Sequence, residues 1–121
     1  MAQAALRYLD FEASEDEDGN GTFDAMAAAA PAQLPDLQAE VLRVLDWAQG
    51  EFGPPAPLEE GGAWDCELQG LQEVATTLDV RWEGRALTLE TRERGAPRVT
   101  LSLTVSGTAA FAAAFRAEFR V

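Results

Sequence analysis

The sequence predicts an α+β fold, a two-layer sandwich in which two or three helices pack on one face of a mainly antiparallel sheet of about four or five strands. Three observations predict it: a helical period over residues 35–52, a period of two from Trp64 to Ser106, and phenylalanines at helical spacing near the end of the chain. The 121 residues are expected to form a single domain, residues 1–121. The expected order is strand, helix, helix, a meander of strands, and helix.

The first two expected elements are a strand and a short helix. Residues 4–13 hold apolar side chains close together, which suits a strand with apolar residues on both faces. The alanine-rich segment 23–30 ends at Pro31 and predicts a helix, with Thr22 as its N-cap and Asp24 near its positive end.

A longer amphipathic helix is predicted over residues 35–52. Pro35 suits the first helical position, and Gly53 followed by two prolines ends the helix. Residues 53–63 show no period and are expected to form a loop. The apolar stripe of the helix recurs at a period of 3.6 and consists of Leu37, Val41, Val44, Leu45, Ala48 and Phe52.

Alternation of apolar and polar residues predicts the strands that follow. A hairpin is expected around Glu83–Gly84, where a two-residue turn would pair Val80 with Leu87 and Leu78 with Leu89 on one face. A last strand is expected over residues 98–106, with a polar side that faces water or a lighter cover. By parity, Arg81, Arg92 and Arg98 are expected on the polar sheet face, in ion pairs with acids of neighbouring strands.

Aromatic residues are expected to form the core. Phe111, Phe115 and Phe119 recur every four residues on a C-terminal helix that Thr108 can cap, and they are expected to pack on the sheet. The alternative is an exposed docking stripe, for which a homodimer is the simplest outcome. The three tryptophans, Trp47, Trp64 and Trp82, are expected to anchor the core, and Cys66 shares the parity of Trp64 and is expected to point inward.

The charge of the chain bears on its partners. The net charge is −12, and residues 1–65 carry 14 acids and 2 arginines, whereas residues 66–121 carry 7 of each. Direct binding to nucleic acid or to an anionic membrane is therefore not expected, because both need a positive surface. No apolar run approaches the length of a membrane span. A single cysteine and an N-terminus without the pattern of a signal peptide predict a cytoplasmic protein.

The residue inventory excludes many reactions. The chain has no histidine and no lysine, which excludes Ser–His and Cys–His nucleophile pairs, histidine-liganded metals and Schiff-base chemistry. One cysteine cannot form a thiolate zinc site or a CxxC pair within one chain, and no dinucleotide fingerprint is visible, so no cofactor is expected. Carboxylate chemistry remains open, but 21 acids give no means of choosing a catalytic pair.

The segment DEDGNG, residues 16–21, resembles the start of an EF-hand calcium loop. Such loops place oxygen ligands at positions 1, 3, 5, 7 and 9, which here are Asp16, Asp18, Asn20, Thr22 and Asp24. Position 12 is Ala27 instead of a bidentate glutamate, and the preceding segment reads as a strand. Any calcium binding is therefore expected to be weak, with a dissociation constant of about 10⁻⁴–10⁻³ M. A tight turn explains the same residues, because glycine and asparagine tolerate positive φ.

Three functional hypotheses follow from the sequence. The first is a small acidic binding module whose partner is another protein or a second copy of the chain. The second is a weak calcium- or magnesium-binding module built on residues 16–24. The third is a small carboxylate-dependent enzyme, such as an isomerase or a hydrolase, which the inventory permits but does not support.

Overall fold

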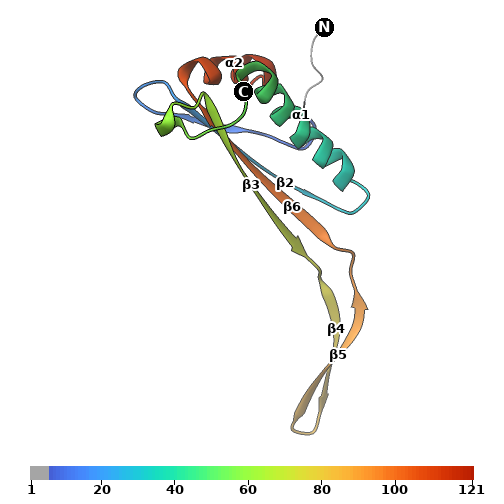
Figure 1. Ribbon diagram of the computed structural model, residues 1–121. Helices are drawn as coiled ribbons and strands as arrows, with labels where there is room; N and C mark the ends of the chain where they lie inside the picture. Colours follow the sequence, from blue (N-terminus) through green and yellow to red (C-terminus); the bar gives the residue numbers. More distant parts are fainter. Residues whose placement is uncertain (1–5) are drawn as a thin grey trace.

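The computed structural model describes residues 6–121 and confirms the α+β architecture. Over these residues the chain forms six strands in two antiparallel sheets and two helices, α1 (Leu34–Phe52) and α2 (Ala109–Phe119). Both helices lie on the same side of the larger sheet (Figure 1). The larger sheet has the order β1-β2-β6-β3, with bounds Glu12–Glu15 for β1, Gly21–Ala29 for β2, Arg98–Gly107 for β6 and Trp64–Glu73 for β3.

The short helix predicted over residues 23–30 is wrong, because this segment is strand β2. Phe23 and Ala25 are buried, whereas Asp24 and Met26 are exposed, so burial follows the period of two that a strand has. All nine residues of β2 pair with β6, and its first four also pair with β1. Pairing with β6 along the whole segment thus outweighs the helix propensity of alanine, and Thr22 lies inside a strand instead of capping a helix.

The strand predicted over residues 4–13 is replaced by irregular backbone up to Phe11, and residues 4 and 5 lie outside the described residues. The buried carboxylate of Glu40 in α1 accepts hydrogen bonds from three successive backbone N–H groups, those of Arg7, Tyr8 and Leu9, at 2.8, 2.9 and 2.6 Å. Glu40 therefore accepts hydrogen bonds from backbone N–H groups that would otherwise pair with a neighbouring strand.

The core lies between the larger sheet and the two helices. Phe111 and Phe115 of α2 are fully buried, and the ring of Phe111 stacks on Trp64 with 5.8 Å between ring centroids. Trp47 of α1 contacts Phe111 and Phe115, so the aromatic residues join both helices to the sheet. The core role predicted for the phenylalanine stripe is confirmed. The side chain of Thr108 accepts the N–H of Phe111 and caps α2, as predicted.

Two glycines allow α2 to lie close to the sheet. Gly21 and Gly107 face each other across β2 and β6. A Cβ atom on Gly107 would overlap the side chain of Phe111, and one on Gly21 would lie 2.8 Å from the Cβ of Ala112. The first turn of α2 therefore needs glycine at both positions.

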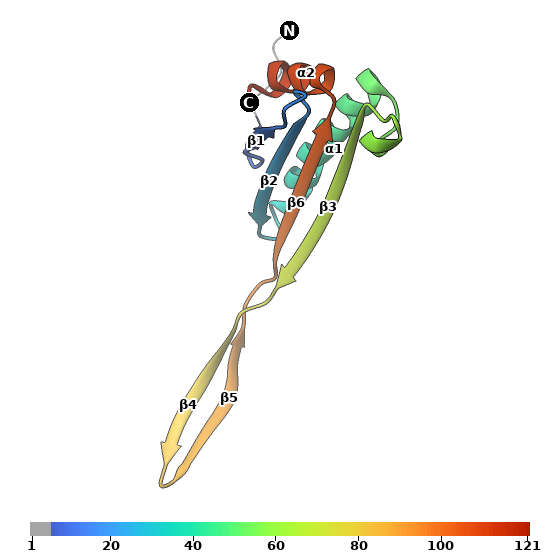
Figure 2. The same ribbon diagram turned by 90° about the vertical axis from the view of Figure 1, so that its left-hand side faces the viewer.

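A second sheet consists of a single hairpin, β4 (Thr76–Glu83) and β5 (Ala86–Arg94), which extends away from the helices and the larger sheet (Figure 2). We call residues 76–94 the arm, and residues 6–73 and 98–121 the body. The arm follows β3 and precedes β6, and residues 74–75 and 95–97 form the joint between arm and body. At the joint the N–H of Gly95 donates to the carbonyl of Ala75 at 2.8 Å.

Neither helix in residues 6–121 combines the length and the hydropathy of a membrane-crossing helix. A short 3₁₀ turn, Leu58–Glu60, lies in the segment between α1 and β3 that was predicted to be a loop.

Candidate functional site

The hairpin of the arm forms at the predicted place but in a different register. Val80 lies opposite Leu89 and Trp82 lies opposite Leu87, so the predicted pairs of Val80 with Leu87 and Leu78 with Leu89 are wrong. The loop consists of Gly84 and Arg85, and Gly84 has a φ of 60°, as expected for the first position of a type II′ turn. Because the register differs by two residues, the apolar side chains still share one face.

We call this side of the hairpin the apolar face of the arm. All five of its large side chains are exposed, and the exposed fractions are 44% for Leu78, 57% for Val80, 82% for Trp82, 63% for Leu87 and 58% for Leu89. The core role predicted for Trp82 is therefore wrong, although it holds for Trp64, which is 1% exposed. Trp82 follows the alternation of a core strand, but neither helix extends over the arm (Figure 1).

The polar atom of Trp82 is satisfied inside the arm. Its indole Nε1–H donates to the carbonyl of Gly84 at 2.9 Å, next to the hairpin turn. The remainder of the indole is apolar surface, so a partner could cover the ring without leaving a buried donor unpaired.

The opposite face of the arm is polar. Arg92 lies across the hairpin from Asp79, with 3.9 Å between Nε and Oδ1, which confirms the predicted cross-strand ion pairing for this arginine. The arm carries four acids and four arginines, so its net charge is zero and the whole charge of −12 belongs to the body. The arm is thus the neutral part of a strongly acidic chain.

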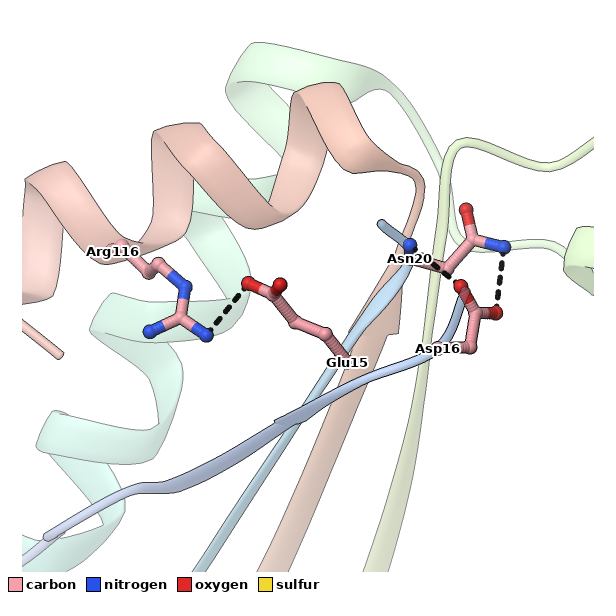
Figure 3. A network of polar contacts seen from close by, with 4 residues as sticks. All are labelled: Glu15, Asp16, Asn20 and Arg116. Atoms are coloured by element: carbon pink, nitrogen blue, oxygen red, sulfur yellow. Dashed lines mark hydrogen bonds and ion pairs between the residues drawn. The ribbon is translucent and has the colours of Figure 1, made fainter. Parts of the chain in front are cut away.

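Residues 16–20 form a tight turn between β1 and β2. Oδ1 of Asp16 accepts the backbone N–H groups of Asp18 and Asn20 at 2.9 and 3.0 Å. Its Oδ2 accepts the side-chain amide of Asn20 at 2.9 Å, and Figure 3 shows the two bonds from Asn20. Gly19 has a φ of 83°. The hydrogen bond from the Asn20 side chain is the main cause that lowers the pKa of Asp16 below the usual value of 3.8.

Part of the predicted metal site lines a hollow of about 370 Å³ beside this turn. It is lined by Asp16, Asn20 and Thr22, whereas Asp24 lies further along β2 and accepts the hydroxyl of Thr104 at 2.6 Å. Asp18 enters the turn through its backbone N–H. Among residues 6–121, no three or more His, Cys, Asp or Glu side chains are grouped in a way that could hold a metal ion. Calcium binding by residues 16–24 stays a prediction.

A second hollow, of about 560 Å³, lies on the sheet face opposite the helices. Three carboxylates line it, those of Asp10, Glu12 and Asp24, together with Gln69, Ser102 and Thr104. Converging acids are what a carboxylate-dependent enzyme requires, but all three acidic residues are exposed to solvent. Acid–base catalysis by two carboxylates depends on environments that separate their pKa values, and an open hollow supplies little exclusion of water.

Cys66 of β3 is half-buried and packs against the core. Burial, and then the charge of Asp65, raise the pKa of the Cys66 thiol above its usual value of 9.0. The thiolate is therefore disfavoured near neutral pH, which fits the predicted packing role.

Comparison of the chain with protein-family models, with curated proteins and with solved structures gives no match.

Proposed function

We propose that this protein is a non-catalytic binding module that engages a protein partner through the apolar face of the arm. The exposure of that face carries the proposal: five large apolar side chains, led by Trp82, project from a hairpin that no other described element covers. Apolar patches of several hundred Å² on a protein surface usually mark an interaction site. Tryptophan is also among the residues that contribute most to binding energy in protein interfaces.

The architecture of the arm supports the same function. A two-stranded hairpin is marginally stable in water by itself, and no core residue of the described chain comes from the arm. A partner that covers the apolar face would remove about 25 cal/mol of unfavourable free energy for each Å² of apolar surface. Binding would thereby stabilise the hairpin as well as the complex.

The proposed partner is a protein, and the proposed location of the complex is the cytoplasm. The body carries a net charge of −12, which disfavours contact with nucleic acid and with anionic lipid. A single cysteine fits a reducing compartment.

Affinity capture tests the proposal, with three forms of the chain used as bait in a lysate of the source organism. The arm variant carries Trp82→Thr and Leu87→Thr, which remove apolar surface and retain a residue that suits strands. The control carries Leu42→Thr on α1, where the leucine is 57% exposed, similar to the arm residues. We expect at least one protein to be captured by the wild type and the control but not by the arm variant.

The captured protein must then bind the purified chain directly, with an affinity at least tenfold lower for the arm variant. Equal capture by all three forms, together with no arm-dependent association of the purified chain, would refute the proposed function.

A further inference from the structure

We infer that the partner of the apolar face is a second copy of this chain, and that two arms pack face to face and antiparallel in a homodimer. This inference rests on the proposed function, since it names the occupant of the same surface. Three features of the arm lead to it: its charge, its extent and the order of large and small residues along it.

The charge of the chain favours association through the arms. Two bodies that each carry −12 repel each other, whereas the two arms are neutral. A strand of eight or nine residues spans about 30 Å at about 3.3 Å per residue, so antiparallel arms that overlap along their length place the two bodies at opposite ends. That separation exceeds the screening length of about 8 Å at physiological ionic strength. The arrangement therefore buries apolar surface while it keeps the acidic bodies apart.

The extent of the apolar face suits a weak dimer. The five side chains, exposed by 44–82%, offer an area on the order of 500 Å² per copy. Two copies together would bury about 1,000 Å², the lower limit of specific protein interfaces. An interface of this size is typical of weak, transient complexes, and we expect a dissociation constant in the micromolar range.

The order of residues along the hairpin is self-complementary. Val80 and Leu89 form the middle cross-strand pair, Trp82 and Leu87 lie toward the turn, and Leu78 lies opposite Thr91 toward the joint. A two-fold axis at the middle pair places the large Trp82 of one copy over the smaller Leu78 of the other. The same contact occurs twice, as a two-fold interface requires.

Sedimentation equilibrium of the purified full chain, from micromolar concentration to about 1 mM, tests the inference. The middle-pair variant carries Val80→Thr and Leu89→Thr. Leu71→Thr is the control, because Leu71 of β3 lies outside the arm and has the same exposed fraction as Leu89, 58%. We expect dimerisation to weaken at least tenfold in the middle-pair variant and less than twofold in the control. Far-UV circular dichroism and amide NMR spectra check that the bodies of both variants stay folded.

Two measurements on the wild type do not depend on any variant. Added salt should leave the dimer essentially unchanged, because the two bodies already lie further apart than the screening length, whereas a contact between opposite charges would weaken. Small-angle X-ray scattering should show an elongated dimer with a body at each end.

A chain that stays monomeric up to about 1 mM, or a dimer that the middle-pair variant and the control weaken equally, would overturn the inference. If the chain is monomeric but another protein is captured through the arm, the proposed function survives and its partner is that protein. If monomeric chain binds phosphatidylcholine vesicles and Val80→Thr/Leu89→Thr abolishes that binding, the face contacts lipid and the inference is overturned.

Discussion

Asp16 illustrates how one side chain can hold a turn that resembles a ligand site. Its carboxylate accepts two backbone N–H groups and one side-chain amide within residues 16–20. These bonds use the oxygen atoms that a cation would need. The residue types at alternate positions therefore predict a calcium loop and a turn equally well, and the sequence alone could not choose between them.

The lowered pKa of Asp16 predicts a specific pH dependence. A group whose pKa is lower in the folded state stabilises the fold above its unfolded pKa, and this contribution is lost as the pH falls through the folded pKa. We expect Asp16→Ala to lower the free energy of unfolding at pH 6–7 and the difference from wild type to shrink below about pH 4. Urea unfolding at several pH values measures this difference. Asp18→Ala is the control, because Asp18 contributes only its backbone N–H to the hydrogen bonds of Asp16, and the substitution keeps that group. A difference that stays constant down to pH 2 would contradict the assignment.

The same turn sets an expectation for calcium. Asp16, Asn20 and Thr22 line one hollow, whereas Asp24 is hydrogen-bonded to Thr104. We expect a dissociation constant of about 10⁻³ M or weaker, because calcium must compete with the hydrogen bonds of the turn. An amide NMR titration with Ca²⁺, repeated with Mg²⁺ and with Asp18→Ala, measures it. Saturable shifts at micromolar Ca²⁺ that are confined to residues 16–24 would show a true metal site.

Glu40 is a further residue whose role the sequence did not reveal, because it lies in a helix with other acids. Its carboxylate binds the N–H groups of Arg7, Tyr8 and Leu9. We expect Glu40→Ala to lower the free energy of unfolding by about 3 kcal/mol or more, since three donors lose their partner. Glu51→Ala, on the exposed side of the same helix, should change it by less than about 0.5 kcal/mol. Equal effects in urea unfolding would refute this role.

At the scale of elements, the packing of α2 on the larger sheet depends on Gly107. A side chain there would overlap Phe111, so we expect Gly107→Ala to cost about 2–3 kcal/mol of stability. Gly50→Ala is the matched control, because Gly50 lies in α1 and its Cβ would meet open space. That change should be neutral or stabilise the protein by up to about 1 kcal/mol. Thermal unfolding that gives the two variants equal stability would contradict the proposed close contact.

The elements differ in how well the sequence predicts them. Residues 35–52 have a complete apolar stripe with clear signals at both ends, and α1 covers Leu34–Phe52. In residues 23–30 the alanines carry little periodic signal, and their helix propensity is weak compared with the pairing that β6 supplies. Strand identity there depends on contacts that are distant in sequence, which local patterns do not contain.

At the scale of the whole molecule, the sequence predicts the hairpin but not its isolation. Leu78, Val80 and Trp82 alternate with polar residues in the same way as Trp64, Cys66 and Leu68 of β3. Alternation shows that a face is apolar, but whether a helix covers that face depends on where α1 and α2 lie. The face stays uncovered where the paired strands extend beyond the helices. How far they extend depends on the tertiary structure.

The separation of arm and body predicts that the body folds without the arm. No core residue lies between residues 76 and 94, and Ala75 and Gly95 already lie within hydrogen-bond distance at the joint. We expect deletion of residues 76–94 to preserve a cooperative thermal transition, with a midpoint within about 8 °C of wild type. Circular dichroism measures the transition, and a chain that melts without cooperativity would show that the arm supports the body.

The position of the arm in the chain also bears on how fast the protein folds. β3 and β6 pair along their whole length, from Trp64 with Gly107 to Glu73 with Arg98, and pairing them alone must close a loop that spans residues 74–97. The turn at Gly84 and Arg85 closes locally, and hairpins form in about 1–10 μs. Once the hairpin of the arm has formed, it brings Glu73 and Arg98 together and shortens the loop that remains to be closed. A segment that contributes no residue to the native core can thus accelerate the pairing of β3 with β6.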